Sequence, residues 1–196
     1  MNRQSNHPDE NKCRAVSPKL RTKDLVLTAL MAAVLCIVSP WSINIGPIPF
    51  SFSLFAIYLT MYLLGARLGT LSVLLYLLIG LLGLPVFSNF TGGPQKLFGP
   101  TGGFLIGYLP MALLIGLFLD HTQKEHITFR HTLLRILAVF ACTWVLYLFG
   151  TIWYMFFSGT GFLAALSVTV LPFVLIDLVK NILAAVLGPA IRKRIR

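Results

Sequence analysis

The feature that most constrains this chain is a series of long apolar segments joined by short polar connections. These segments lie at about residues 25–43, 51–65, 68–84, 103–119, 132–157 and 161–190. A helix that crosses a lipid bilayer needs about 20 mostly apolar residues. Only 11% of the residues are charged and 57% are hydrophobic, whereas soluble domains are about one quarter charged. The sequence therefore predicts an all-α integral membrane protein with six transmembrane helices.

The basic residues fall on one side of the predicted membrane, and cytoplasmic connections of membrane proteins collect Lys and Arg. With a cytoplasmic N-terminus, the outer side receives only Lys96. The inner side then receives the basic residues of the N-terminal segment, together with Arg67, Lys124, Arg130, Arg135, Arg192, Lys193, Arg194 and Arg196. We therefore predict that both termini are cytoplasmic.

The first residues differ in composition from the rest of the chain. Residues 1–23 contain six basic side chains and little apolar surface, which predicts a disordered cytoplasmic tail. Residues 24–196 are predicted to form a single transmembrane domain. The formal charge of +10 does not indicate a nucleic-acid partner, because the chain lacks the soluble basic face with interleaved aromatic side chains that such proteins use.

Asp177 and Lys180 form the strongest chemical signal in the sequence. Pro172 disfavours helical structure at the residue before it, so a helix is predicted from Pro172 to about Ala190. Asp177 and Lys180 then lie in its outer half, and their i, i+3 spacing puts them on one face. One charge at mid-membrane costs roughly 2.5 to 3.5 kcal/mol. The pair is therefore predicted to bind a ligand in a polar cavity; the alternative is a structural pair that neutralises itself.

A second signal is the connection at 83–103, which contains six glycines and three prolines with Phe87, Phe90 and Phe98 between them. Glycine lets the backbone approach a ligand closely, proline restricts the loop, and aromatic rings can cover an apolar ligand. We predict a binding lid, with an ordinary turn-rich connector as the alternative.

Several classes of chemistry lack their working residues. The chain has no phosphate-binding loop of the GxxxxGK type followed by Ser or Thr, so energy from ATP would have to come from a partner chain. We find no nucleophile with its base and no metal-ligand pattern, and we predict no catalytic residues, no metal and no cofactor. Ala29 and Ala33 are small residues one helical turn apart, which favours close approach of a partner helix in lipid.

Five sequence elements together resemble the BioY family, the biotin-specific S components of energy-coupling-factor (ECF) transporters. The elements are GPIPF from Gly46, YLLIGLLGLPVF from Tyr76, the glycine pair Gly92 and Gly93, GPTGGFLIG from Gly99, and PFVLIDLVKNILAA from Pro172. They extend from the first outer connection to the last helix, so the resemblance covers nearly all of the chain after the tail.

The resemblance implies the S-component fold and a high-affinity biotin site near the outer surface of a bacterial cell membrane. It also implies a complex with a transmembrane coupling protein, which Ala29 and Ala33 would contact, and two cytoplasmic ATPases. The implied substrate-binding residues are Asp177, Lys180, Tyr76, Phe87, Asn89, Gly92, Gly93, Phe104 and Ser53. Two of these depart from the family pattern: Ser53 replaces a frequent Gln, and Phe104 replaces a frequent Tyr.

Three other functions remain open at this point. The chain could be an S component for another vitamin, a self-sufficient secondary transporter, or a membrane enzyme that uses Asp177 and Lys180. The enzyme is the weakest of these, because one acid and one amine without a nucleophile or metal form a poor catalytic set.

Overall fold

The computed structural model describes residues 21–44, 48–122 and 129–195. Its elements are α1 (Thr22–Val38), β1 (Ser42–Asn44), β2 (Pro49–Ser51), α2 (Ser53–Leu81), α3 (Pro94–Leu97), α4 (Gly102–Thr122), α5 (Phe129–Ser158), α6 (Phe162–Thr169) and α7 (Leu171–Ile195). Most of the predicted disordered tail lies outside the described residues, as does the start of the GPIPF element at Gly46.

Long apolar helices dominate the described part of the chain. In lipid, every backbone polar group must be satisfied within the protein, and a helix does this within one segment. Four helical stretches are long and apolar enough to cross a membrane: α2, α4, α5 and the stretch from Phe162 to Arg192. Helix α1 has 17 residues, which extend roughly 26 Å at about 1.5 Å per residue.

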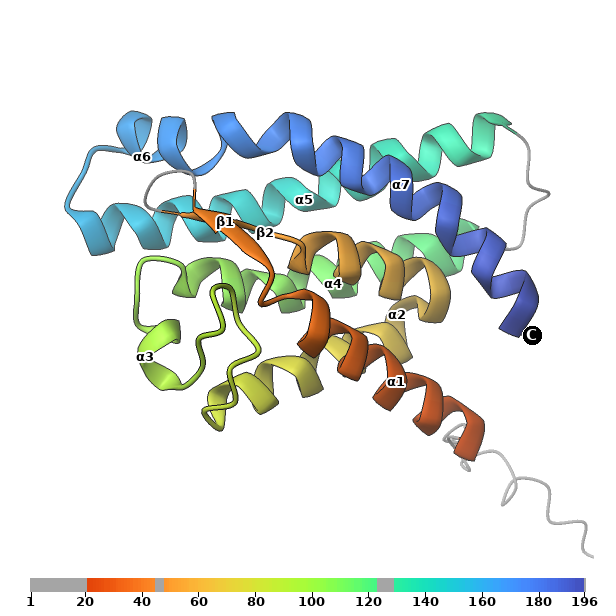
Figure 1. The fold of residues 1–196 in the computed structure, drawn as a ribbon. Helices are drawn as coiled ribbons and strands as arrows, with labels where there is room; N and C mark the ends of the chain where they lie inside the picture. Colours follow the sequence, from red (N-terminus) through yellow and green to blue (C-terminus); the bar gives the residue numbers. More distant parts are fainter. Residues whose placement is uncertain (1–20, 45–47, 123–128, 196) are drawn as a thin grey trace, which may run out of the picture.

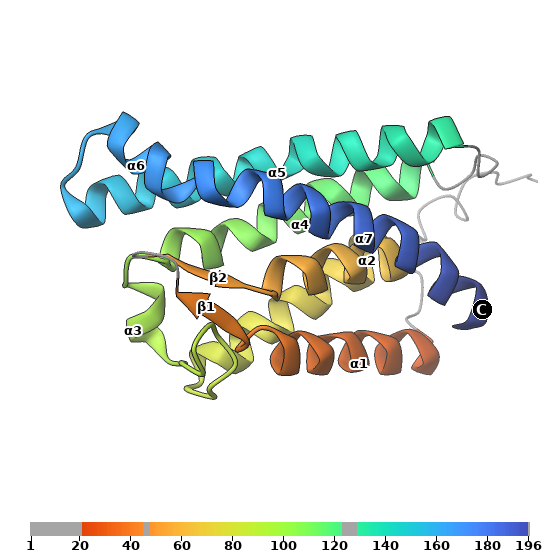
Figure 2. The ribbon, with the colours of Figure 1, turned by 45° about the horizontal axis from the view of Figure 1, so that its top comes forward.

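Helix α2 is divided by a turn at Gly65. The backbone there has φ 76° and ψ −164°, a combination that is essentially restricted to glycine. Asp120 of α4 stabilises the turn, since its Oδ2 accepts a hydrogen bond of 2.9 Å from the backbone N–H of Ala66. Figures 1 and 2 both show the orange half of α2 running away from the β-strands and the yellow half returning. The two predicted segments at 51–65 and 68–84 correspond to these halves.

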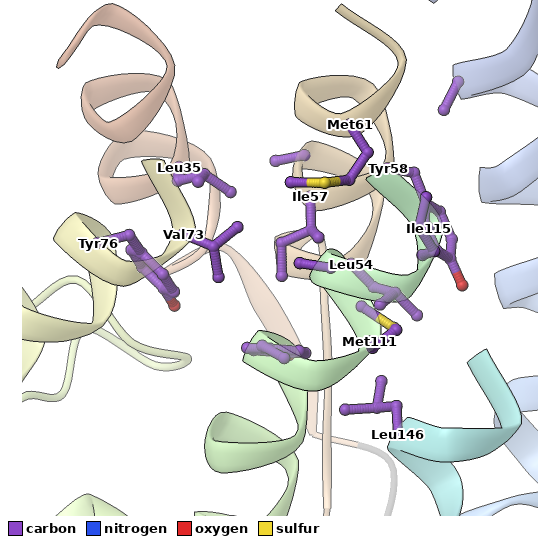
Figure 3. Close-up of a cluster of buried hydrophobic side chains, with 14 of the residues drawn as sticks. Leu35, Leu54, Ile57, Tyr58, Met61, Val73, Tyr76, Met111, Ile115 and Leu146 are labelled. Carbon is purple, nitrogen blue, oxygen red and sulfur yellow. The ribbon is translucent and has the colours of Figure 1, made fainter. Parts of the chain in front are cut away.

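The apolar core lies where α1, α2, α4 and α5 meet. Figure 3 shows Leu54 of α2, Met111 of α4 and Leu146 of α5 close together, with Leu35, Ile57 and Val73 in the same cluster. Two buried hydrogen bonds join helices through this region. The hydroxyls of Tyr58 and Thr143 lie 2.6 Å apart, and Ser72 donates to the backbone carbonyl of Thr28 at 3.0 Å.

The first connection contains a small sheet that was not predicted. The segment at 25–43 was expected to be one span, but the helix ends at Val38 and residues 42–44 form β1, which pairs antiparallel with β2. Ile43 lies opposite Phe50 in this sheet. Pro49 and Phe50 belong to the GPIPF element, so part of this element is a strand that leads through Ser51 to the start of α2.

The two ends of the molecule differ in structure. Figure 1 shows the strands, α3 and α6 toward one end, while the beginning of α1 and the C-terminal end of α7 lie at the other. Arg135 was predicted to face the inner side, and it belongs to the predicted apolar segment at 132–157. It lies within α5, is only 8% exposed, and its Nη2 donates to the backbone carbonyl of Thr122 at 2.7 Å. The backbone carbonyl replaces water for one nitrogen of the guanidinium, whereas Nε has no hydrogen-bond partner among the described residues.

Candidate functional site

A cavity lies between the β-strands and helices α2, α4, α5 and α7. Its polar wall is formed by Ser51, Ser53, Tyr76, Ser88, Thr101, Tyr108, Tyr147, Thr169, Asp177 and Lys180, and its apolar wall by Ile48, Pro49, Leu54, Phe104, Leu105, Leu146 and Phe173. The volume is about 70 Å³, whereas pockets for drug-sized ligands usually have roughly 300 to 1,000 Å³. A ligand of that size therefore requires side chains of the wall to move.

Asp177 and Lys180 meet in this cavity, as their spacing on α7 predicted. Lys180 Nζ lies 2.9 Å from Asp177 Oδ1, and the two residues are 6% and 4% exposed. Lys180 also donates to the backbone carbonyl of Ser51 at 2.8 Å, and its ammonium lies 3.9 Å from the ring centroid of Phe50. A cation over an aromatic face is stabilised by the ring's electron distribution. Strand β2 therefore supplies two partners for Lys180.

The second oxygen of Asp177 has its own donor. Tyr147 of α5 donates from its hydroxyl to Asp177 Oδ2 at 2.8 Å. Each carboxylate oxygen thus accepts one hydrogen bond. The hydrogen bonds from Lys180 and Tyr147 offset the free-energy cost of removing the carboxylate from water. Tyr147, Phe50 and Ser51 are not among the predicted site residues. Tyr147 is 30 residues from Asp177 in the sequence, and Ser51 contributes only a backbone carbonyl. Neither contact follows from a sequence motif.

Two hydroxyls in the cavity wall have no hydrogen-bond partner among the described residues. They are Tyr76 Oη and Thr101 Oγ1. A buried polar group without a partner costs roughly 1 to 3 kcal/mol, and such groups are uncommon in folded proteins. Tyr76 is fully buried and belongs to α2, while Thr101 immediately precedes α4. Both hydroxyls lie where a polar ligand could supply the missing hydrogen bonds.

Five of the predicted substrate-binding residues line the cavity: Asp177, Lys180, Tyr76, Phe104 and Ser53. The hydroxyl of Ser53 lies 2.6 Å from that of Ser51, so these two serines form a polar edge where β2 leads into α2. Phe104 is partly buried at the start of α4 and contributes an aromatic face. The two positions that depart from the family pattern, Ser53 and Phe104, are thus both in contact with the cavity.

The other four predicted residues lie outside the cavity wall in this structure. Phe87 is fully buried and packs edge-on against Tyr76, with ring centroids 5.6 Å apart. Asn89 accepts a hydrogen bond of 2.8 Å from the Ser42 hydroxyl and donates to Asn44 Oδ1 at 2.8 Å. Phe87 therefore supports a cavity residue from behind, and Asn89 fastens the 83–103 connection to β1.

Gly92 and Gly93 shape the same connection. A Cβ atom at Gly92 would collide with the backbone carbonyl of Leu84, so no larger residue fits while the connection has this path. The backbone N–H of Gly93 donates to the Gly80 carbonyl at 2.7 Å, which holds the connection against the end of α2. The connection is therefore tied to its surroundings on both sides.

The rest of the 83–103 connection reaches the cavity through Ser88 and Thr101. Trp153 of α5 donates from Nε1 to the backbone carbonyl of Gly99 at 2.9 Å, which fixes the segment just before Thr101. Lys96 lies in α3, where partial burial lowers the pKa of its ammonium from the ordinary value. The connection thus covers one side of the cavity, and its role as a lid that moves with the ligand stays a prediction.

The predicted docking residues Ala29 and Ala33 are both exposed on α1. Ala32, between them, is buried, so the two exposed alanines form a smooth face directed away from the bundle. Across the described residues, no group of three or more His, Cys, Asp or Glu side chains is arranged to hold a metal ion.

Comparison with known proteins gives consistent matches along the chain. The sequence profile of the BioY family matches residues 10–196. The biotin transporter BioY of Thermotoga maritima is 36% identical over 172 residues, which cover 87% of this chain and 96% of that protein. The biotin transporter BioY2 of Lactococcus lactis is 36% identical over 167 residues, which cover 85% of this chain and 88% of that protein.

The fold also matches a solved structure. The crystal structure of the S component for biotin from an ECF-type ABC transporter superimposes with a TM-score of 0.80 and 31% sequence identity. The match covers 87% of this chain and 91% of that one. The predicted S-component fold is thus confirmed for the mainly helical arrangement.

Proposed function

The chain belongs to the BioY family, and we propose that it binds biotin in the cavity formed around Asp177 and Lys180. It is a biotin uptake subunit of the ECF type, since its relatives are biotin transporters and its structural neighbour is a biotin S component. It is a transport protein rather than an enzyme. The resemblance that the sequence elements indicated is correct.

One observation carries the choice of site: a buried, hydrogen-bonded ion pair lies in the same cavity as two unpartnered hydroxyls. Biotin has a carboxylate, a ureido group with two N–H donors and a carbonyl, and an apolar ring body. Lys180 can bind the carboxylate, because the structure accounts for two hydrogen bonds of an ammonium that can donate three. The hydroxyls of Tyr76 and Thr101 can donate to or accept from the ureido group.

The apolar wall suits the remaining part of biotin. Phe104, Phe173 and Leu146 come from α4, α7 and α5, so three helices would enclose the ring body. Phe50 and Phe173 are stacked, with centroids 6.5 Å apart, and this arrangement joins the aromatic wall to the ring beneath Lys180. The cavity therefore has charged, polar and apolar lining residues, and such a ligand has groups of all three kinds.

The proposed topology has six spans with both termini in the cytoplasm. Helix α1, the two halves of α2, α4, α5 and α7 would supply the spans. The reversal at Gly65 supports counting α2 twice, and it lies at the same end as the start of α1 and the C-terminal end of α7 (Figure 1). The exposed basic residues Arg21, Arg67 and Arg194 would then face the cytoplasm, and the cavity would open to the outside of the cell membrane.

Transport is proposed to require partners. The exposed face of Ala29 and Ala33 would meet a transmembrane coupling protein, because small residues allow helices to approach closely in lipid. Two cytoplasmic ATPases would act through that protein. The 83–103 connection would serve as the lid, since it contributes Ser88 and Thr101 to the cavity wall.

The experiment that tests this function is calorimetric titration of the purified chain in detergent with biotin. We expect one-to-one binding by the parent protein and loss of at least tenfold in affinity for Lys180→Ala and Asp177→Asn. Arg130→Ala, which removes an exposed basic side chain outside the cavity wall and the 83–103 connection, is the control and should bind as the parent does. Each variant must remain monodisperse by size-exclusion chromatography.

The alternatives give different results in the same series. Competition by another vitamin with no heat from biotin would assign a different substrate. Biotin accumulation by the chain alone in proteoliposomes would identify a self-sufficient transporter. Equal binding by the parent and both α7 variants would remove Asp177 and Lys180 from the site.

A further inference from the structure

A second hollow lies at the end of the molecule opposite the ligand cavity. It is lined by Arg21, Lys23, Asp24, Leu27, Leu30 and Met31 of the α1 region, Leu63, Leu64 and Leu68 of α2, and Arg192 of α7, and its volume is about 350 Å³. The start of α1 and the C-terminal end of α7 lie together at this end in Figures 1 and 2. We refer to it as the terminal groove.

The terminal groove has two chemically different parts. Arg21, Lys23 and Arg192 are basic, and Asp24 is the one acidic residue in the lining. Asp24 Oδ2 already accepts a hydrogen bond of 3.2 Å from the backbone N–H of Arg21, so its carboxylate is engaged in the first turn of α1. With three basic residues and one acidic residue among its described lining residues, the charged part carries a net positive charge.

The remainder of the lining is apolar. Leucines of α1 and of both halves of α2 form it, and Leu30 is 54% exposed. Leu63 and Leu64 precede the turn at Gly65 and Leu68 follows it. The turn thus brings leucines from two antiparallel segments to the side of α1.

From this combination we propose that the terminal groove binds one anionic phospholipid. The phosphate of the headgroup would lie against Arg21, Lys23 and Arg192, and an acyl chain would lie along the leucines. Basic pockets between transmembrane helices on the cytoplasmic side are suited to anionic headgroups. The assignment to the cytoplasmic leaflet rests on the topology proposed above, whereas the match of charge and apolar surface does not depend on it.

Charge complementarity favours a lipid over the chain's own N-terminal segment. The twenty residues before Arg21 contain Arg3, Lys12, Arg14 and Lys19 but only Asp9 and Glu10 as acids. A net basic segment would be repelled by the basic part of the groove. Free phosphate would use that part alone and leave the leucines in contact with water or lipid, so a lipid satisfies both parts together.

Native mass spectrometry of the full chain with added phosphatidylglycerol tests the proposal. We expect one retained phosphatidylglycerol per chain and little retention of phosphatidylcholine. Arg21→Gln/Arg192→Gln should weaken this binding roughly 30-fold, or about fivefold for each charge removed near the membrane surface. Arg130→Gln/Arg194→Gln removes two exposed charges outside the groove and is the matched control, with the parent's lipid binding expected.

Two further readouts keep the result interpretable. Both double variants should bind biotin as the parent does, because the ligand cavity lies at the opposite end. If the parent fails to bind biotin, the proposed function fails while the lipid test remains valid.

Equal loss of phosphatidylglycerol in both double variants would mean general charge attraction and overturn the site. Displacement of the lipid by millimolar inorganic phosphate would identify a phosphate site instead. If Arg21→Gln/Arg192→Gln no longer co-purified with the coupling protein but still retained phosphatidylglycerol, the groove would be a protein interface.

Discussion

The Tyr147 hydroxyl donates a 2.8 Å hydrogen bond to Asp177 Oδ2, the carboxylate oxygen that Lys180 does not hold. This places the donor on α5 and the acceptor on α7. The bond therefore fixes both the orientation of the carboxylate and the separation of two neighbouring helices that line the ligand cavity. It follows that Tyr147 should act on binding through the position of Asp177.

Tyr147→Phe removes this donor while keeping the ring. A hydrogen bond to a charged group contributes roughly 1.5 to 3 kcal/mol. Without it, binding must supply the free energy that holds Asp177 in this orientation, so we expect biotin affinity to fall about tenfold. Calorimetric titration measures the change. Tyr154→Phe alters a partly buried tyrosine of the same helix that lies outside the cavity wall, and it should bind normally. An unchanged affinity in Tyr147→Phe would show that Lys180 alone orients Asp177.

The ligand's carboxylate should meet Lys180 rather than Asp177. Both oxygens of Asp177 already accept hydrogen bonds, and a second anion would be repelled by it. We therefore expect the primary amide of biotin to bind the parent at least tenfold more weakly than biotin does. In Lys180→Ala this difference between the two ligands should nearly disappear. A difference that persists in Lys180→Ala would place the carboxylate elsewhere in the cavity.

Gly65→Ala should destabilise the fold. Backbone of φ 76° and ψ −164° costs a residue with a Cβ roughly 1 to 3 kcal/mol, and the new Cβ would collide with the Asp120 carboxylate. For a loss of about 2 kcal/mol we expect the melting temperature in detergent to fall by roughly 4 to 8 °C. Gly161→Ala is the control, because its φ is −67° and no atom lies near the added methyl. Equal melting temperatures for Gly65→Ala and the parent would contradict this account.

Ala29→Trp/Ala33→Trp should prevent assembly with the coupling protein. Both alanines are exposed, so the larger side chains fit the isolated chain but would hold a partner helix away. We expect co-purification of coupling protein and ATPases to be lost while biotin affinity is retained. Ala164→Trp, at an exposed alanine of α6, controls for an added indole and should leave the complex intact. Normal assembly of the double variant would move the interface away from this face.

The sequence predicted the parts of the site that depend on spacing along one helix. Asp177 and Lys180 share a face because they are three residues apart, and charge in an apolar segment marks them as unusual. Their partners were not predictable in the same way. Phe50 and Ser51 reach Lys180 only because β2 pairs with β1, and Ser51 uses a backbone carbonyl that every residue possesses.

For the fold, too, the sequence predicted local features but not contacts between residues far apart in the chain. Apolar length identified the helical segments, but it could not show that the first helix ends at Val38 and that a strand follows. Charge counting assigned Arg135 to the inner side, but it depends on residue type alone and did not predict that this side chain is buried in α5. The carbonyl of Thr122 that accepts its hydrogen bond belongs to α4, and sequence pattern gives no measure of that proximity.

The pairing of Asp177 with Lys180 also has an electrical consequence. Because the two charges cancel, the empty site contributes no net charge to the interior of the membrane. A bound carboxylate adds one negative charge. Carrying that charge inward against an inside-negative voltage would cost about 2.3 kcal/mol per 100 mV. A site of this design would hold its cargo on the outer side until an external source of free energy acts on it.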